Sequence, residues 1–349
     1  MSETPVIIVG AGIAGLTCAR ELQRRGIASL VLERSRGVGG RCATRRVEAQ
    51  PVDHGLPFLH VRSREFSDLI DELELGARLS GWPLVVREPR LACQPEAFTG
   101  GHRRWAYAEG MNILPRALAR GLDVRLEHTV VALAEEHTRL VVTLSSGERL
   151  LAPHVVLAGS LPQSLRLLEP IVPRCHHGAE RFAPLTQVTT QPVLTVLAGY
   201  ALDTPDPGFD AWHPIETTML QSIYHDSNKR ESPRHRVLVM HSRPRFARER
   251  IEKSPEEWAA ELLWEAGDLL GEWAMRPLWS QPHRWGTGRV RAGAQVGGVG
   301  VFETFSGPAA LVVGDAMGHD AGAEGAFFSG LAAAEQIAYR PASDIPALP

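Results

Sequence analysis

The sequence has few cysteines and no long hydrophobic run. Cysteine accounts for four of its 349 residues, and Cys18, Cys42, Cys93 and Cys175 are too far apart to form a C-x-x-C pair. This spacing indicates neither a structural zinc site nor a redox disulfide, and we expect no metal. Because no apolar stretch is long enough to span a bilayer, we expect a soluble, cytoplasmic protein with no membrane contact.

Charge of either sign is also not in large excess. The chain carries 37 basic and 40 acidic residues, for a formal net charge of −3, which gives no reason to expect nucleic acid or an acidic membrane as a partner. A hydrophobic content of 44% is ordinary for a globular protein. The length exceeds that of a typical domain and predicts two domains, in a monomer or a homodimer.

The N-terminal segment predicts a strand, a glycine turn and a helix. Residues 6–9 read VIIV, a run typical of a strand buried on both faces. Gly10, Gly12 and Gly15 follow as G-x-G-x-x-G, in which the first glycine allows a tight turn and the second lets a phosphate approach the backbone. The third glycine lets the following helix pack on the sheet, and Gly26 is placed to stop that helix.

The next segment indicates the kind of nucleotide. A second buried strand, residues 29–32, ends in Glu33, whose carboxylate can accept hydrogen bonds from ribose hydroxyls. Gly39-Gly40-Arg41 then offers a close backbone approach and a cation to a diphosphate. The combined motif resembles the FAD site of glutathione-reductase-type flavoproteins, in particular their amine-oxidase branch. The FAD contacts expected in this half are Gly10, Gly12, Ile13, Ala14, Gly15, Glu33, Arg34, Gly40 and Arg41.

The resemblance implies further cofactor contacts. In such flavoproteins the strand that contains Val130 and Val131 lies beside the adenine. Near the C-terminus, a buried strand at 311–313 leads to Gly314-Asp315 and to a small-residue helix near Glu324. The aspartate would hold ribityl or phosphate hydroxyls, and the helix N-terminus would face the flavin edge where negative charge develops on reduction. The expected contacts there are Gly314, Asp315, Glu324, Gly325 and Ala326.

A narrower resemblance extends over nearly the whole chain. The stretches GGRCATRR, VDHGLPFLHVRSREF, IYHDSNKR, QPHRW and GDAMGHDAGAEG occur in the order found in renalase-like FAD oxidoreductases. The resemblance implies an α/β fold with non-covalent FAD in a discontinuous Rossmann-like domain (1–62, 108–160 and 286–340). An inserted α+β substrate domain with a mixed sheet (63–107 and 161–285) would cover the flavin, and 341–349 would be a flexible tail.

The same resemblance implies the residues of the substrate site. Asp226 and Lys229 match the family's D-x-x-K loop, His241 matches a histidine that ends a strand, and His283 and Trp285 belong to its H-R-W motif. We expect Lys229, His241 and His283 to be catalytic, and Asp226, Trp285 and Phe58 to line the pocket. The chain departs from the family at Pro57-Phe58, where a Gln-aromatic pair is usual, and at Ala316-Met317, where an aromatic residue is frequent.

Three functions remain open from the sequence. The first is a renalase-like oxidase, which passes a hydride from an isomeric dihydro-NAD(P) to flavin N5 and returns the electrons to dioxygen as hydrogen peroxide. The second is an FAD-dependent amine oxidase or desaturase that acts on a small amine or pathway intermediate. The third is a flavin-binding protein without turnover. Hydride transfer needs proximity and orientation rather than a strong base, so the absence of an obvious catalytic triad does not exclude an enzyme.

Overall fold

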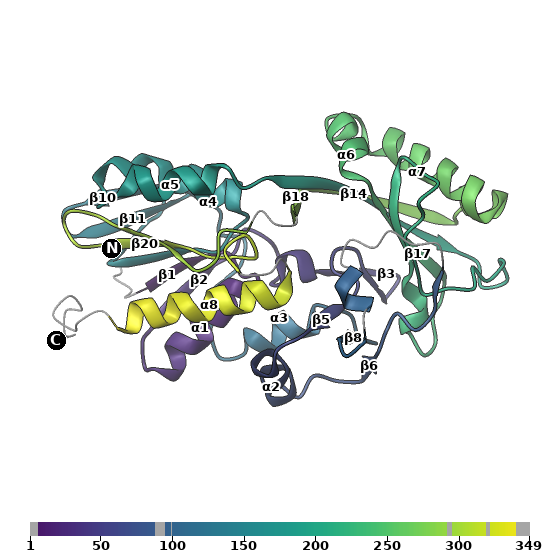
Figure 1. The fold of residues 1–349 in the computed structure, drawn as a ribbon, viewed down its shortest axis with the longest axis horizontal. Coiled ribbons are helices and arrows are strands. Elements are labelled where there is room, and N and C mark those ends of the chain that lie inside the picture. The colour runs from purple at the N-terminus through teal and green to yellow at the C-terminus, as the bar shows by residue number, and fades with distance from the viewer. Residues whose placement is uncertain (1–5, 88–94, 99, 292–294, 319–321, 340–349) are drawn as a thin grey trace. The chain divides into compact units, whose positions relative to one another are not determined.

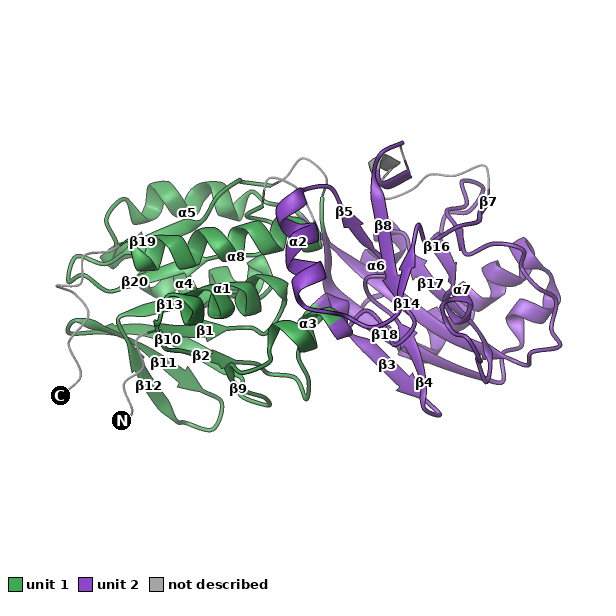
Figure 2. Ribbon diagram, turned by 90° about the horizontal axis from the view of Figure 1, so that it is seen from below, with its two compact units in different colours: residues 1–40, 114–189, 290–349 green, residues 41–113, 190–289 purple. Residues whose placement is uncertain are grey.

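The computed structural model describes residues 6–87, 95–98, 100–291, 295–318 and 322–339, so the predicted tail at 341–349 lies outside the described residues. The described residues form two compact units, each built from separate stretches of the chain (Figure 2). Unit 1 contains residues from 1–40, 114–189 and 290–349, and unit 2 contains residues 41–113 and 190–289.

A Rossmann-like sheet forms the centre of unit 1. Its strands are β1 (Val6–Val9), β2 (Ser29–Leu32), β9 (Asp123–Arg125), β13 (His154–Leu157), β19 (Gly300–Glu303) and β20 (Ala309–Val312). They lie in the order β19-β20-β13-β1-β2-β9, and every neighbouring pair is parallel except β19 and β20. β1 and β2 coincide with the predicted strands, and their nonpolar side chains are buried because helices cover the sheet.

Two helices from opposite ends of the chain lie side by side in unit 1 (Figure 1). They are α1 (Ile13–Arg24) and α8 (Ala323–Ala338), and α8 begins where the sequence predicted a helix. A Cβ on Gly330 of α8 would lie 2.3 Å from the carbonyl oxygen of Ala14, so glycine permits the close approach of the two helices. α1 ends just before Gly26, whose φ of +74° is the left-handed conformation that stops a helix.

Most of the remaining elements of unit 1 bury nonpolar side chains in one core with this sheet. An antiparallel sheet contains β10 (Val130–Glu136), β11 (Arg139–Leu144) and β12 (Arg149–Ala152), with the predicted turn around Gly147 between the last two. The helices are α3 (Ile113–Leu118), α4 (Leu161–Leu168) and α5 (Gly178–Thr186), with the 3-10 turn η3 (Glu169–Arg174). The 3-10 turn η1 (Gly40–Cys42) begins at the last residue of this stretch of unit 1 and continues into unit 2. The helix predicted from Met111 begins two residues later, at Ile113, because a turn precedes it.

Unit 2 contains a mixed sheet in the order β18-β14-β17-β16-β15-β7. These strands are β7 (Val86–Arg87), β14 (Thr190–Tyr200), β15 (Ala211–Trp212), β16 (Leu220–His225), β17 (Arg236–Ser242) and β18 (Trp279–Val290). The helices α6 (Pro244–Arg250) and α7 (Pro255–Leu270) bury their apolar side chains in the core of this sheet. α7 begins after Ser254, whose hydroxyl accepts a capping hydrogen bond from the Glu257 N–H at 3.2 Å.

Smaller elements complete unit 2 and supply most of its polar site. The strands β3 (Thr44–Val47) and β4 (Gln50–Asp53) form a hairpin, and β5 (Leu59–Val61), β6 (Arg78–Ser80) and β8 (Arg103–Tyr107) form a separate antiparallel sheet. The other helical elements are α2 (Arg64–Glu72), η2 (Pro95–Phe98), η4 (Asp226–Lys229) and η5 (Glu272–Met275).

The boundaries of the two units differ from the predicted domain boundaries. Residues 41–62 were expected with the nucleotide domain but lie in unit 2, because Asp53 and the backbone that follows it bond to η4 and β17. Residues 161–189 were expected in the substrate domain but lie in unit 1, where Leu161, Leu168 and Leu185 join the core of its sheets.

Candidate functional site

Glycines arrange the backbone at the carboxyl end of β1. Gly10 has a φ of +111°, and a Cβ there would lie 2.9 Å from the carbonyl oxygen of Ala158. A Cβ on Gly15 would lie 2.1 Å from the carbonyl oxygen of Gly10, so α1 could not pack there with a larger residue. Gly12, by contrast, is the N-cap of α1 with no side-chain cap, and a Cβ there would meet nothing within 4 Å. The start of α1 is therefore open to an anion, as a bound diphosphate requires.

The acid after β2 and the second glycine pair lie beside this turn. The Glu33 carboxylate accepts the N–H of Ala11 at 2.8 Å and the N–H of Ser35 at 2.9 Å. A carboxylate has about four acceptor positions, so Glu33 retains capacity for ribose hydroxyls. The N–H of Gly39 donates to the Ala11 carbonyl at 2.8 Å, and the atom nearest to a Cβ on Gly40 would be the Gly12 Cα, at 3.9 Å. These residues fit the pyrophosphate and ribose of FAD.

The other predicted cofactor residues occupy several environments. Ile13 and Ala14 are buried in the first turn of α1, Arg34 is exposed after Glu33, and Arg41 is half-buried at the start of unit 2. Val130 is half-buried and Val131 is exposed on β10. The contacts of these residues with FAD stay predictions.

The C-terminal motif lies at the same edge of the sheet as the glycine turn. β20 runs parallel to β13 and β1, so Gly314 and Asp315 follow the carboxyl end of a neighbouring strand. Gly314 has a φ of +138°, and its N–H donates to the Ser329 hydroxyl of α8 at 2.9 Å. α8 starts after Gly322 without a side-chain cap, and Glu324, Gly325 and Ala326 are buried in its first turn. A helix start at this edge suits the electron-rich side of a flavin.

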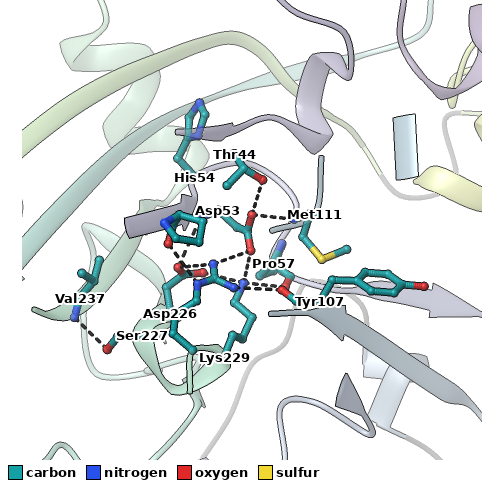
Figure 3. A network of polar contacts seen from close by, with 12 residues as sticks. Thr44, Asp53, His54, Pro57, Tyr107, Met111, Asp226, Ser227, Lys229 and Val237 are labelled. Carbon is teal, nitrogen blue, oxygen red and sulfur yellow. Dashed lines mark hydrogen bonds and ion pairs between the residues drawn. The ribbon is translucent and has the colours of Figure 1, made fainter. Parts of the chain in front are cut away.

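A second polar site lies in unit 2, where four buried charges pair with one another (Figure 3). The Lys229 ammonium lies 2.6 Å from carboxylate oxygens of both Asp53 and Asp226. The Arg230 guanidinium contacts the same two carboxylates at 3.1 and 3.0 Å. The four side chains are at most 5% exposed and their charges sum to zero. We call Asp53, Asp226, Lys229 and Arg230 the buried charge cluster.

Further hydrogen bonds saturate the buried charge cluster. Asp53 also accepts the hydroxyl of Thr44 at 2.6 Å and the N–H of Met111 at 2.8 Å. Arg230 donates to the carbonyls of Pro51 and Tyr107. Despite burial, the neighbouring Lys229 and Arg230 lower the pKa of Asp53 to about 2. This geometry does not support the predicted contact of Lys229 and Asp226 with a substrate, because both side chains are enclosed.

Three histidines and a tryptophan form a third group, in which His54 directly follows Asp53 of the buried charge cluster. The ring of His54 stacks on Trp285 with centroids 5.3 Å apart, and His283 meets both rings edge-on at 4.7 and 4.3 Å. His241 contacts the carbonyl of His54 through Nε2 at 3.2 Å, and the indole N–H of Trp285 donates to the same carbonyl at 3.2 Å. The structure thus brings three of the predicted substrate-site residues, His241, His283 and Trp285, together around His54.

Hydrogen bonding fixes the tautomers of His241 and His283. A carbonyl can only accept, so Nε2 of His241 carries the proton and Nδ1 faces the Arg289 guanidinium at 3.3 Å. Nδ1 of His283 faces the Arg45 guanidinium at 3.1 Å and must accept from it, since arginine only donates. Burial, and then the adjacent arginine, lowers the pKa of His241 to about 3 and that of His283 to about 4. Both imidazoles are neutral at physiological pH.

The buried histidines predict a loss of stability in weak acid. Burial also lowers the pKa of His54, to about 3. A histidine whose pKa falls on folding binds more protons when unfolded, so its contribution is complete above pH 6.5 and declines as the pH falls towards 3. We expect the holoprotein to lose roughly 1 kcal/mol for each of the fully buried His54 and His241 between pH 7.5 and 5.5, measured by urea unfolding. His241→Asn should reduce this difference, and an unchanged difference would contradict the assignment.

Phe58 belongs to an aromatic group that contacts His241 through Tyr224. Its ring contacts Trp82 and Phe98 with centroids 6.2 and 5.9 Å apart, while Tyr224 contacts Trp82, His213 and His241. Most of these rings are buried, which agrees with a structural role for much of the aromatic content of unit 2. The described residues contain no group of three or more His, Cys, Asp or Glu that could hold a metal, and no described helix could cross a membrane.

Several residues of these sites had no signal of their own in the sequence. Asp53 and His54 lie in the stretch VDHGLPF, which contributes to the resemblance but predicts no role for either residue. Arg45 lies in GGRCATRR, and Arg289 in the stretch RVRAG that follows the H-R-W motif. Arg45 and His283 are 238 positions apart, so their contact follows from the fold of unit 2 and from no local pattern.

Comparisons with known proteins agree with the FAD-type geometry of unit 1. Residues 8–73 match the NAD(P)-binding Rossmann-like domain, and residues 91–338 match the flavin containing amine oxidoreductase family. A Mycobacterium tuberculosis protein assigned as a flavin-containing monoamine oxidase is 33% identical over 159 residues, which are 42% of this chain and 35% of that protein. The chain thus aligns with about a third of the length of this curated relative.

Solved structures show the same fold over almost the whole chain. A protein of Exiguobacterium assigned as a protoporphyrinogen oxidase superposes with a TM-score of 0.74 at 16% identity, covering 97% of this chain and 99% of that one. A putrescine oxidase superposes with a TM-score of 0.69 at 17% identity, covering 97% and 100%. At these identities the likeness extends to the fold and not to the substrate.

Proposed function

The chain belongs to the flavin containing amine oxidoreductase family and is an FAD-dependent oxidoreductase, and we propose that it is an oxidase of the renalase-like type. Its substrate would be a flat dihydropyridine with anionic groups, of which an isomeric dihydro-NAD(P) is the prototype. Non-covalently bound FAD would accept the hydride at N5, and dioxygen would take up the electrons and leave as hydrogen peroxide.

The proposal rests on the environment of Arg45. Its guanidinium is half-buried and donates to the amide oxygen of Gln281 at 3.1 Å and to the neutral His283. Both partners are uncharged, and burial lowers the pKa of Arg45, with no acidic side chain of the described residues raising it. A partly desolvated cation beside the stacked rings of His54 and Trp285 favours a planar ligand that bears a phosphate or carboxylate. It disfavours an ammonium substrate by like-charge repulsion.

Within this proposal the histidines bind and orient rather than transfer protons. His241 and His283 stay neutral, and each directs Nδ1 at an arginine, so neither lone pair is available as a general base. They would hold Arg289 and Arg45 in place. Trp285 and His54 would supply a flat surface for the ring that loses the hydride. The predicted catalytic roles of His241 and His283 thus become positioning roles, and the same holds for Lys229 in the buried charge cluster.

A second function is favoured by the aromatic group around Tyr224. Phe58, Trp82 and Tyr224 form a mostly apolar environment next to neutral His241. Such surroundings stabilise the neutral form of an amine, which is the form that an amine oxidase or a desaturase acting on a nitrogen compound needs. The name of the putrescine oxidase with the same fold is in keeping with this alternative.

Anaerobic flavin reduction separates the two functions. The purified holoprotein is mixed with isomeric dihydro-NAD, isomeric dihydro-NADP and a panel of amines, and the oxidised flavin band at about 450 nm is followed. Bleaching by the dihydropyridines, reversed by air with formation of peroxide, is expected. Bleaching by an amine alone would establish the alternative. A flavin that stays oxidised with the dihydropyridines would exclude them as substrates.

Replacing Arg45 tests the anionic part of the substrate. We expect Arg45→Ala to raise the concentration of isomeric dihydro-NAD that gives half the maximal rate of flavin reduction by roughly tenfold or more. The reason is the loss of a partly buried, charge-assisted hydrogen bond to the substrate. Arg46→Ala is the matched control, since Arg46 lies next in the same strand and is exposed. Equal effects of the two substitutions would mean that Arg45 does not contact the anion.

A further inference from the structure

The Lys229 ammonium holds both ends of one short turn. It donates to the carboxylate of Asp53 at 2.6 Å and to the carbonyl of Pro57 at 3.2 Å. Between these two anchors lie His54, Gly55 and Leu56. The third contact of the ammonium, at 2.6 Å, is to Asp226 in η4. An ammonium has three donors, so Lys229 commits all of them to this arrangement and has none left for a ligand.

The turn 53–57 also makes close contacts with the backbone of Arg41 and the ring of Trp285. The N–H of Leu56 donates to the carbonyl of Arg41 at 2.9 Å. A Cβ on Gly55 would lie 2.1 Å from the carbonyl oxygen of Arg41 and 3.1 Å from the ring of Trp285. Only glycine therefore fits at this position. The backbone of 53–57 is thereby fixed by a side chain from η4 and by the backbone of η1.

One carbonyl in this turn orients two predicted site residues. The His54 oxygen accepts the Nε2–H of His241 and the indole N–H of Trp285, both at 3.2 Å. These side chains come from β17 and β18, so this one carbonyl joins the two strands through the turn. If the carbonyl shifted, the Nε2–H tautomer of His241 would no longer be favoured. Nδ1 could then carry the proton and could no longer accept from Arg289.

We propose that Lys229 is a positioning residue: its ammonium clamps the turn 53–57 so that the His54 carbonyl fixes the tautomer of His241 and the orientation of Trp285. This inference deepens the proposed function, on which its catalytic consequence rests. Asp226 and Arg230 serve the clamp by balancing its charge, because all four side chains are buried. A lysine that only stabilised the fold could be replaced by an apolar residue of similar size without changing His241.

The tautomer of His241 can be observed without any substrate. Holoprotein with ¹⁵N-labelled histidine is studied by long-range ¹H–¹⁵N correlation, and His241→Asn identifies the His241 signals. The test variant is the charge-balanced pair Asp226→Asn with Lys229→Met, which removes the clamp and keeps the cluster neutral. Asp210→Asn is the control. Asp210 is a buried carboxylate of unit 2 that binds the N–H groups of Leu84 and Val85 and the side-chain amide of Asn228 in η4, so its substitution perturbs η4 and leaves the three contacts of the Lys229 ammonium intact.

We expect a single Nε2–H tautomer in the unmodified protein and in Asp210→Asn, and a mixture of both tautomers in the charge-balanced variant. With an active substrate, the charge-balanced variant should also lose about tenfold or more in the limiting rate of flavin reduction. If that variant does not fold, Asp53→Asn is used, which removes the charge of one anchor of the turn. We expect it to show the Nδ1–H tautomer of His241 as a minor population beside the Nε2–H tautomer. A single unchanged tautomer in the folded variants would overturn the clamp, whatever substrate the enzyme proves to use.

Discussion

Replacing Gly12 with valine is expected to give a folded protein that does not bind FAD. A Cβ at Gly12 meets no atom within 4 Å, and the φ of −82° is accessible to any residue, so the fold has no reason to fail. The isopropyl group would fill the space over the start of α1 where the pyrophosphate is expected. We expect the affinity for FAD to fall by at least about 100-fold, or roughly 2.7 kcal/mol, measured by flavin titration of the apoprotein.

Gly15 provides the contrasting control in the same motif. A Cβ there would lie 2.1 Å from the Gly10 carbonyl and 3.1 Å from the Ala158 methyl, so Gly15→Val should prevent α1 from packing and yield little folded protein. Circular dichroism of the two variants separates loss of the cofactor from loss of the fold. A Gly12→Val protein that remains yellow after gel filtration would show that the diphosphate does not pass over this turn.

The nucleotide half of the protein could be predicted because its signals are local. Gly10, Gly12 and Gly15 lie within one turn, and Glu33 follows at the end of the next strand, so the chain itself brings them to one edge of the sheet. The comparisons confirm FAD and the Rossmann-like fold. The C-terminal motif lies at the other end of the chain and was assigned to the same site by resemblance to flavoproteins. The parallel pairing of β20 with β13 brings it to the same edge of the sheet.

The substrate half could be predicted only in part, because its contacts join distant segments. Lys229 and Asp226 were identified by resemblance, but nothing in the sequence indicated that Asp53, 176 positions before Lys229, would enclose them. An ionisable side chain in a motif is as compatible with a buried ion pair as with catalysis, and burial decides between them. The histidine tautomers likewise depend on carbonyls and arginines that only the folded chain brings near.

The buried charge cluster leads to a large expected loss of stability. We expect Lys229→Met alone to lower the free energy of unfolding by roughly 3–5 kcal/mol, because two carboxylates would then face one guanidinium without solvent. The side chains of Asp53 and Asp226 are 0 and 1% exposed, so water cannot compensate for the missing charge. Urea unfolding at pH 7.5 with a fixed concentration of FAD measures the effect, after the ligand term RT ln(1 + [FAD]/Kd) is subtracted with the Kd of each variant.

The charge-balanced pair Asp226→Asn with Lys229→Met distinguishes charge from shape. If the cost of Lys229→Met comes from an unpaired carboxylate, then neutralising Asp226 leaves Asp53 with Arg230 at 3.1 Å and should restore most of the lost stability. If the cost comes from lost hydrogen bonds and packing, the second substitution should add to the first. Restored stability together with a mixture of His241 tautomers would separate two roles of Lys229. Its charge would stabilise the fold, and the position of its ammonium would set the orientation of the His54 carbonyl.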